Sequence, residues 1–387
     1  MITPAYSPTA TERVLPRMAL DFTTASLDSR VTVTRALNTA TRINSSGVIE
    51  TVNANLPRFD YSLGSGGACK GLLIEEARTN SLTGVDCVNP TATTGWTAFG
   101  DAAGVFSVVD DTAALTSAGL AGICSSGKVF RMDNSAGATP FYARFNNTIT
   151  IGVATWTYSA YARGSGVFTF QNNSGTWSGT TSPAISSQYQ RLTSTGVGST
   201  SPTNFRIKAD AGSVLYFILA QAEEGAFVTS VIPNTGSSVT RNADAVSMTG
   251  TNFSSWYNQS EGAIVCSVSG GKNSVWAVSY DMGTTGNLAY VRQTSPTAVS
   301  SVINGAGSSG TSITADTAYT TALAYKINDC AFAINGGQLS TFAGTPGTAT
   351  DLIIGSLNGS FVLNGHVKKL MFYPQRLTNA ECVAFSK

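Results

Sequence analysis

The stretch TWTYSAYARG, residues 155–164, indicates a β-fold. Large and small side chains alternate along it with a period of two, which is the pattern of a β-strand. One face would carry Trp156, Tyr158 and Ala160, and the other Thr157, Ser159 and Tyr161. The alternation therefore predicts a strand that leaves at least one aromatic ring for the outer surface.

Strand-like runs of the same kind recur on both sides of this stretch, from about residue 86 to 240. They are separated by clusters of Gly, Ser and Asn at intervals of roughly ten to fifteen residues, which is typical of a β-sandwich. The run VLYFILA, 214–220, is the longest apolar one. A membrane-spanning helix needs about 20 apolar residues, so this run predicts a buried strand.

A second group of strand-like runs follows residue 241. Residues 233–246, PNTGSSVTRNADAV, hold Val239 as their one aliphatic residue larger than alanine before Val246, and predict a linker. About eight short runs then follow, which predicts a second sandwich of jelly-roll type. Near the chain end, Thr378 and Glu381 have the spacing of a capping box, so a short helix is expected at 378–385.

The first 85 residues alternate in short segments but contain few large apolar side chains. In RVTVTR, 30–35, Val31 and Val33 share one face of a half-buried strand. Such a segment is too poor in apolar residues to form its own core and must pack on something else. The expected fold is all-β, with two β-sandwich (jelly-roll) domains at 86–240 and 241–387, an extended strand-rich N-terminal module at 1–85, and very little helix.

The composition argues against several classes of protein. Charged residues make up 12% of the chain, about half of the usual ~25%. The net charge of +1 provides no field that would attract nucleic acid or an anionic membrane. The N-terminal residues include two early prolines and no continuous apolar run, which does not fit a cleaved signal peptide. We expect no nucleic-acid partner and no membrane insertion.

Six cysteines lie far apart in the sequence and include no C-x-x-C pair: Cys69, Cys87, Cys124, Cys266, Cys330 and Cys382. This spacing does not fit a zinc site. It favours buried or free thiols in a reducing cytosol, and disulfides formed after release from the cell are the alternative.

Candidate catalytic groups are few. His366 is the single histidine, so a catalytic triad would have to use it and a multi-histidine metal site is excluded. Three pairs of adjacent carboxylates occur, Glu75 with Glu76, Asp110 with Asp111, and Glu223 with Glu224. Neighbouring side chains diverge in strands and helices, which argues against a glycosidase pair, although carboxylates from distant loops could still meet.

No nucleotide-binding loop is present despite 39 glycines. No EF-hand is present either, although sandwich loops can bind calcium without a linear motif. The sequence therefore predicts no cofactor, no metal and no catalytic residue.

Tryptophans in or beside Gly/Ser/Asn-rich segments are the remaining binding candidates, because exposed rings can stack on the apolar faces of sugars. They are Trp96, Trp177, Trp256 and Trp276. Core packing is the competing interpretation for each of them. Among them, Trp96, Trp177 and Trp276 are the candidate glycan-binding residues.

The N-terminal region carries a family resemblance. Residues 20–61, LDFTTASLDSRVTVTRALNTATRINSSGVIETVNANLPRFDY, together with the later phrase GLLIEEARTN, 71–80, resemble the N-terminal module of tailed-bacteriophage virion proteins. The close of the second region, 220–244, resembles the end of a carbohydrate-binding-like jelly roll. Segments 322–337 and 363–381 resemble a concanavalin A-like or laminin G-like domain.

The resemblance implies a structural or adhesive part of a phage particle, such as a tail fibre, a collar fibre or a head decoration protein. It implies a homotrimer that contacts other virion proteins of the capsid, collar or tail, is assembled in the bacterial cytoplasm, and binds host-surface glycans. It does not imply an enzyme. The alternatives are a glycan-degrading tailspike hydrolase and a bacterial surface lectin, and the missing signal peptide disfavours the lectin.

The phrase KGLLIEEARTN, 70–80, is expected to connect parts of this assembly. Residues Gly71 to Ile74 would form a short buried strand, while Glu75, Glu76 and Arg78 would face solvent or a neighbouring subunit. The candidate attachment or oligomer contacts are Arg58, Phe59, Tyr61, Glu75, Glu76 and Arg78.

Overall fold

The computed structural model describes residues 15–146, 154–166, 168–171, 185–197, 206–269, 277–282, 289–295, 297–314, 316–357 and 360–387. The chain forms two compact units. The middle unit comprises residues 34–70 and 75–244, and the C-terminal unit comprises 15–33, 71–74 and 245–387. Residues from the first 85 thus belong to both units, and the chain passes from one unit to the other more than once.

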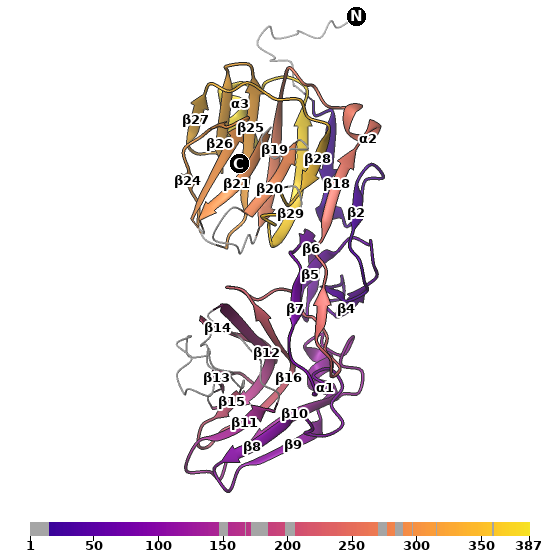
Figure 1. Cartoon of the computed structure of the whole chain (residues 1–387), viewed down its shortest axis with the longest axis vertical. Coiled ribbons are helices and arrows are strands. Elements are labelled where there is room, and N and C mark those ends of the chain that lie inside the picture. The colour runs from indigo at the N-terminus through magenta and orange to yellow at the C-terminus, as the bar shows by residue number, and fades with distance from the viewer. Residues whose placement is uncertain are drawn as a thin grey trace, which may run out of the picture. The chain divides into compact units, whose positions relative to one another are not determined.

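The middle unit is a β-sandwich of two antiparallel sheets (Figure 1). The larger sheet has the order β14 (Gln190–Val197), β12 (Thr155–Ser165), β16 (Val214–Glu224), β10 (Lys128–Asp133) and β9 (Val105–Asp110). The smaller sheet has the order β13 (Phe168–Gln171), β15 (Arg206–Ala209), β11 (Phe141–Phe145) and β8 (Trp96–Gly100). Strand β16 contains the run VLYFILA, and its burial confirms the predicted buried strand.

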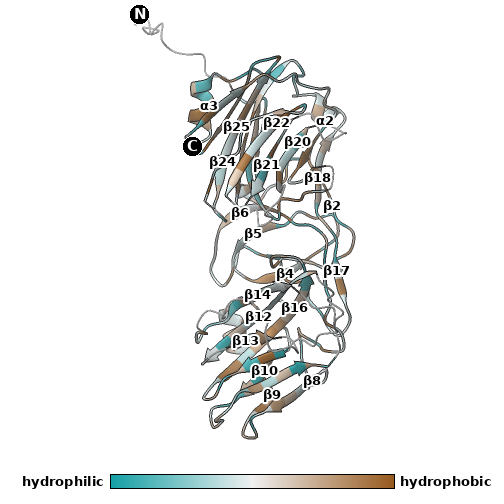
Figure 2. Cartoon of the chain, turned by 60° about the vertical axis from the view of Figure 1, so that its left-hand side comes forward, coloured by the Kyte–Doolittle hydropathy of each residue, from teal (hydrophilic) through white to brown (hydrophobic). Residues whose placement is uncertain are grey.

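Aromatic rings from both sheets fill the space between them. The ring of Trp96 packs edge-on against Phe130, Phe145 and Phe217, with centroids 5.5 to 5.8 Å apart. Along β11 buried and half-exposed residues alternate, and Figure 2 shows strands of this unit banded in brown and teal. Each sheet therefore buries one face against the other, as a period of two requires.

Strand β12 is buried on both faces, contrary to expectation. The alternation predicted at least one aromatic ring on the outer surface, but Trp156 and Tyr158 are buried, and only 5% of Tyr161 is exposed. It packs in a second cluster with Ile218 of β16 and Leu115 of the helix α1 (Thr112–Ser117). The prediction was wrong because a helix and loops cover the back of this sheet, and periodicity within one strand does not show this second layer.

The C-terminal unit is also built from two antiparallel sheets (Figure 1). The first has the order β27 (Leu339–Phe342), β26 (Cys330–Ile334), β25 (Tyr319–Lys326), β19 (Glu261–Ser269), β29 (Gly365–Tyr373) and the end of β6 (Gly66–Ile74), and β1 (Met18–Asp21) also pairs with β29. The second has the order β2 (Thr32–Thr34), β18 (Ala245–Thr249), β28 (Asp351–Ile354), β20 (Ala277–Met282), β21 (Ala289–Ser295), β22 (Ala298–Ile303) and β23 (Ala306–Gly307), and β24 (Thr311–Ser312) also pairs with β22.

Contacts across the interior join these two sheets. The hydroxyls of Ser279 in β20 and Tyr319 in β25 lie 3.3 Å apart. The ring of Trp256, which follows the short helix α2 (Thr251–Ser254), lies 4.9 Å from that of Phe372 in β29. The unit is thus a second sandwich, and the all-β fold with little helix is confirmed.

The predicted C-terminal helix is present as α3 (Asn379–Phe385). Thr378 accepts a hydrogen bond from the Glu381 amide, and Glu381 accepts one from the Thr378 amide, which completes the capping box. Residues of the helix region, including Leu377 and Cys382, pack on a sheet face rich in alanine. Small side chains there let the helix lie close to the strands.

The remaining elements are short: the 3-10 helix η1 (Phe22–Thr24), β3 (Ala40–Ile43), β4 (Ile49–Val52), β5 (Phe59–Ser62), β7 (Arg78–Asn80) and β17 (Val239–Arg241). Strands β7 and β17 pair with each other in the middle unit. The stretch 233–246 was expected to be a linker, and the middle unit ends within it, at Asp244; it also contains β17 and two buried charged residues, Arg241 and Asp244. The stretch thus holds the boundary between the two units, but it is not an exposed linker, because the two charges have buried partners that are distant in sequence.

All six cysteines are free thiols, and all except Cys69 are buried. The buried positions agree with the interpretation of these residues as buried thiols. No helix among the described residues is long and apolar enough to span a bilayer. His366 is the second residue of β29, a strand that lies between β19 and β6.

Candidate functional site

The phrase KGLLIEEARTN forms the end of β6, a short connection and β7. Leu72, Leu73 and Ile74 are buried, which confirms the predicted strand. The two adjacent glutamates then separate, because Glu75 is buried and Glu76 is half-exposed. The two neighbouring carboxylates therefore lie in different environments.

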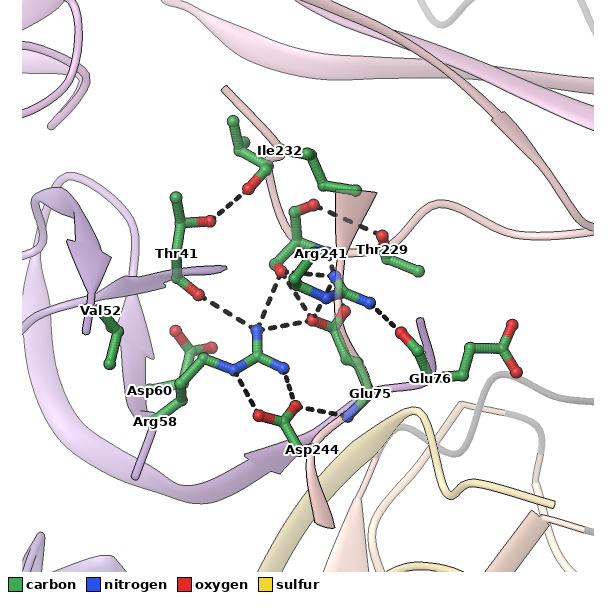
Figure 3. Close-up of polar contacts among 12 residues, drawn as sticks. Thr41, Val52, Arg58, Asp60, Glu75, Glu76, Thr229, Ile232, Arg241 and Asp244 are labelled. Carbon is green, nitrogen blue, oxygen red and sulfur yellow. Dashed lines mark hydrogen bonds and ion pairs between the residues drawn. The ribbon is translucent and has the colours of Figure 1, made fainter. Parts of the chain in front are cut away.

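Glu75 lies among arginine and serine side chains in the middle unit (Figure 3). Its Oε2 is 2.7 Å from Nη1 of Arg58 and 2.9 Å from Nη1 of Arg241. Ser230 donates two further hydrogen bonds to this carboxylate, from its amide at 2.7 Å and from its hydroxyl at 2.6 Å. Both carboxylate oxygens thus accept hydrogen bonds from within the protein.

Asp244 bridges the same arginine to another one. It forms an ion pair with Arg58 through Nη2 and accepts a bond from Nη1 of Arg35 at 2.8 Å. The amide of Glu75 donates to Oδ2 of Asp244 at 3.0 Å, which ties the two carboxylate-bearing segments together (Figure 3). Arg35 also donates to the carbonyl oxygen of Asn53 at 2.7 Å.

Glu223 of β16 is a third buried carboxylate beside Arg241. It accepts bonds from the Thr229 amide at 2.9 Å and the Thr229 hydroxyl at 2.7 Å. Three guanidinium groups and three carboxylates are therefore buried together. We call this set the buried charge cluster: Arg35, Arg58, Glu75, Glu223, Arg241 and Asp244.

The charges in the cluster shift one another's ionisation. Burial alone would raise the pKa of Glu75, but Arg241 and Arg58 outweigh burial and hold that pKa well below its usual range. Burial would lower the pKa of Arg58, whereas Asp244 and Glu75 raise it above its usual value. Burial lowers the pKa of Arg241, with Glu75 acting against it.

Such an arrangement suits structure better than proton transfer. A general acid near neutral pH needs a raised carboxyl pKa and a path to substrate. Glu75 has a lowered pKa and is buried, with both carboxylate oxygens bonded to groups of the protein. The cluster instead links segments near residues 35, 58, 75, 223 and 241, which are far apart in sequence.

Several predicted contact residues are therefore internal. Arg58, Phe59 and Glu75 were expected to make attachment or oligomer contacts, but all three are buried. The expectation that Glu75 faces solvent was wrong, because its cationic partners Arg58 and Arg241 lie 17 and 166 residues away. No local pattern in the sequence shows that they converge.

The other three contact candidates are half-exposed. Arg78 forms an ion pair with Glu76 at 2.5 Å, and its guanidinium lies 4.9 Å from the ring centroid of Phe227. Tyr61 has a raised pKa, caused first by burial and then by the neighbouring Cys69. These residues keep part of their surface available.

A pocket of about 420 Å³ opens beside Arg78, within the middle unit. It is lined by Ala77, Arg78, Thr79, Ser81, Trp156, Glu224, Gly225 and Thr240. Glu224 is the one carboxylate among these described lining residues. A guanidinium, an indole and several hydroxyls can bind a polar ligand, but hydrolysis of a glycosidic bond ordinarily needs two carboxylates.

The other adjacent carboxylate pairs are also divided. Asp111 accepts bonds from Arg163 Nε at 2.7 Å and from the Tyr189 hydroxyl at 2.6 Å, while Asp110 is exposed. Glu223 is buried in the charge cluster, and Glu224 is exposed. In each adjacent pair one member is thus held by the protein's own donors.

The predicted glycan-binding tryptophans are not brought together. Trp96 is 6% exposed and lies in the core of the middle unit. Trp177 and Trp276 lie outside the described residues. Trp256 is buried too, so core packing is the role of both described tryptophans from that set.

Sequence analysis missed a pair of surface aromatics. Phe99 and Tyr142 lie on the outer face of the smaller sheet and stack with their centroids 4.9 Å apart. The signal available in the sequence was the alternation FYARF, 141–145, which puts Tyr142 and Arg144 opposite Phe141 and Phe145. Among the described residues, no group of three or more His, Cys, Asp or Glu could hold a metal ion.

Comparisons with known proteins give limited similarity. No family model matches the chain, and no curated protein matches it. The CBM40 of Ruminococcus gnavus IT-sialidase, bound to α2,3-sialyllactose, is similar at 15% identity over 35% of this chain and 88% of that one, with a TM-score of 0.30.

Two other solved structures resemble the chain at similar levels. Trypanosoma rangeli sialidase in complex with the inhibitor DANA is 11% identical over 73% of this chain and 53% of that one, with a TM-score of 0.30. The receptor binding domain of botulinum neurotoxin mosaic serotype C/D is 9% identical over 37% of this chain and 39% of that one, with a TM-score of 0.27. Similarity this low carries no argument about function.

Proposed function

We propose that this chain is a non-catalytic structural protein of a tailed-bacteriophage particle, in a fibre, a collar or a head decoration. It assembles as a homotrimer with other virion proteins and binds glycans of the host surface. Assembly takes place in the bacterial cytoplasm, and the finished protein resides in the virion.

The proposal rests on the position of the segment GLLIEEARTN in the fold. This phrase bears the resemblance to phage virion modules. Its residues up to Ile74 form the buried end of β6, and Glu75 is the central carboxylate of the buried charge cluster. A segment that makes such internal contacts supports an architectural module rather than a reactive one.

The state of the carboxylates supports the absence of catalysis. One member of each adjacent pair, namely Glu75, Asp111 and Glu223, is held by donors of the protein itself. The pocket beside Arg78 offers one carboxylate among its described residues. A binding protein needs no second acid, whereas a retaining or inverting glycosidase of the usual kind does.

The location in the particle can be tested by electron microscopy. Purified phage that encodes this chain is labelled with antibodies raised against the recombinant protein. We expect label at one defined part of the particle and the full-length chain in its mass spectrum. Particles without label or peptide would exclude a virion role.

The oligomer and the glycan contact need separate measurements. Light scattering of the full-length protein should give three times the 40.1 kDa chain mass, with and without reductant, because all six cysteines are free thiols. Incubation with host capsule or lipopolysaccharide should give retention without release of reducing ends. Release that is lost in a Glu224→Gln variant would instead establish the tailspike hydrolase.

A further inference from the structure

The outer face of the smaller sheet in the middle unit carries rings and cations in register. Phe99 of β8 lies opposite Tyr142 of β11, which lies opposite Lys208 of β15. Arg144 of β11 lies directly opposite Arg206 of β15. We call these five residues the cationic face: Phe99, Tyr142, Arg144, Arg206 and Lys208.

The two rings hold the two guanidinium groups. Phe99 and Tyr142 stack with an interplanar angle of 11°. The guanidinium carbon of Arg144 lies 5.7 Å from the Phe99 centroid, and that of Arg206 lies 5.2 Å from the Tyr142 centroid. Cation–π contacts of this kind restrict a long side chain while leaving its edge N–H groups free to donate.

The charges on this face are not balanced by the protein. Like charges directly opposite each other on one sheet face are destabilising, and Arg144 and Arg206 occupy such a pair. No carboxylate among the described residues forms an ion pair with either of them, whereas Lys208 pairs with Asp210 at 2.8 Å. An anion placed between the two guanidinium groups would relieve the repulsion and accept their hydrogen bonds.

We propose that the cationic face binds an anionic glycan, with Arg144 and Arg206 donating to its carboxylate or sulfate groups. The proposal rests on the glycan-binding part of the proposed function and adds the site and the ligand charge. Charge complementarity points to an acidic chain rather than a neutral one. A duplex nucleic acid is disfavoured, since the sequence pI of about 7.5 and this small patch fall short of the broad basic surface of nucleic-acid-binding domains.

Isothermal titration of the full-length protein at low salt tests the proposal. The probes are oligogalacturonate, a sulfated heparin oligosaccharide and a neutral malto-oligosaccharide of equal length. We expect binding to at least one acidic probe that weakens as salt is added, because exposed charges are screened. Equal or tighter binding of the neutral probe would overturn the anionic class but leave glycan binding in place. Binding of no probe at all would overturn this proposal and the glycan part of the proposed function, while the particle location is tested separately.

Two variants separate the cationic face from other arginines. The double variant Arg144→Gln/Arg206→Gln should lose at least tenfold in affinity. The control Arg131→Gln changes an arginine on the other sheet that also lies over a ring, Tyr216 at 5.8 Å, but pairs with Asp133. Its affinity should stay within twofold. Equal losses in both proteins would overturn the proposal.

A charge-reversal variant provides a second test of the binding site if the double variant folds poorly. Arg206→Glu places opposite charges across the strand pair, so the variant should melt at a higher temperature than the parent. It should also lose at least tenfold in affinity for the acidic probe. Retained affinity would exclude the cationic face as the site. Tighter binding of a DNA duplex of equal charge than of any glycan would overturn the glycan proposal and identify nucleic acid as the ligand.

Discussion

Arginines play opposite roles in two regions of the middle unit. In the buried charge cluster, Arg35, Arg58 and Arg241 lie in the interior, and each donates to a carboxylate or carbonyl oxygen of the chain. On the cationic face, Arg144 and Arg206 lie against rings and opposite each other. Buried arginines thus need partners within the chain, whereas a partly exposed face can leave its arginines available to a ligand.

The largest expected effect is the loss of the central carboxylate. In Glu75→Gln, Arg58 and Arg241 stay buried with one anion fewer, so the free energy of unfolding should fall by about 3 to 5 kcal/mol. Urea unfolding followed by circular dichroism measures this change. A loss below about 1 kcal/mol would show that water reaches the cluster and that its pairs act like surface pairs.

The opposite kind of buried carboxylate is found in the C-terminal unit. Burial raises the pKa of Asp281 in β20 to about 7, with a further rise from Asp351 and a smaller opposite effect from the Met282 amide. No arginine or lysine among the described residues pairs with Asp281. A buried carboxylate without a cation thus favours its neutral form, whereas Glu75 favours its charged form.

The two carboxylates should give opposite dependences on pH. The folded-state pKa of Asp281 is above its unfolded value of 3.8, so the stability it contributes is present below about pH 4 and is lost as the pH rises to about 7. The folded-state pKa of Glu75 is below its unfolded value of 4.5, so its contribution is present above that pH and is lost on acidification.

The variant Asp281→Asn isolates the first of these effects. It should stabilise the C-terminal unit at pH 8 by about 2 to 4 kcal/mol and have little effect at pH 4, because asparagine resembles the neutral acid. Thermal melting of parent and variant across this pH range gives the comparison. A variant that destabilises equally at both pH values would show that Asp281 is charged in the folded protein.

Asp111 tests an intermediate degree of burial. It is paired with Arg163 at 2.5 Å, and the two side chains are 10% and 20% exposed. The variant Asp111→Asn should cost about 1 to 2 kcal/mol, since a charge-assisted bond is lost but water can still reach Arg163. Urea unfolding measures the loss in unfolding free energy of this variant, for comparison with that of Glu75→Gln. A cost equal to that of Glu75→Gln would break the proposed relation between burial and energy.

The sequence predicted the layered β fold but not this distribution of charges. Alternation along TWTYSAYARG and the capping box at Thr378 are local signals, and both elements are present. The role of Glu75 depends on Arg58 and Arg241, which reach it through the tertiary fold. The cationic face likewise depends on the pairing of β11 with β15, 62 residues apart at Arg144 and Arg206, which no local period specifies.

The smallest effect is expected at Glu76, the neighbour of Glu75 in the sequence. Its partner Arg78 lies at 2.5 Å, but the Glu76 side chain is 28% exposed and Arg78 also packs on Phe227. The variant Glu76→Gln should therefore lower the free energy of unfolding by about 1 kcal/mol or less, as partly exposed pairs do. Urea unfolding of this variant and of Glu75→Gln compares the same chemical change at two neighbouring positions. Equal losses would mean that the position of these glutamates in the chain, and not burial among arginines, determines their contribution to stability.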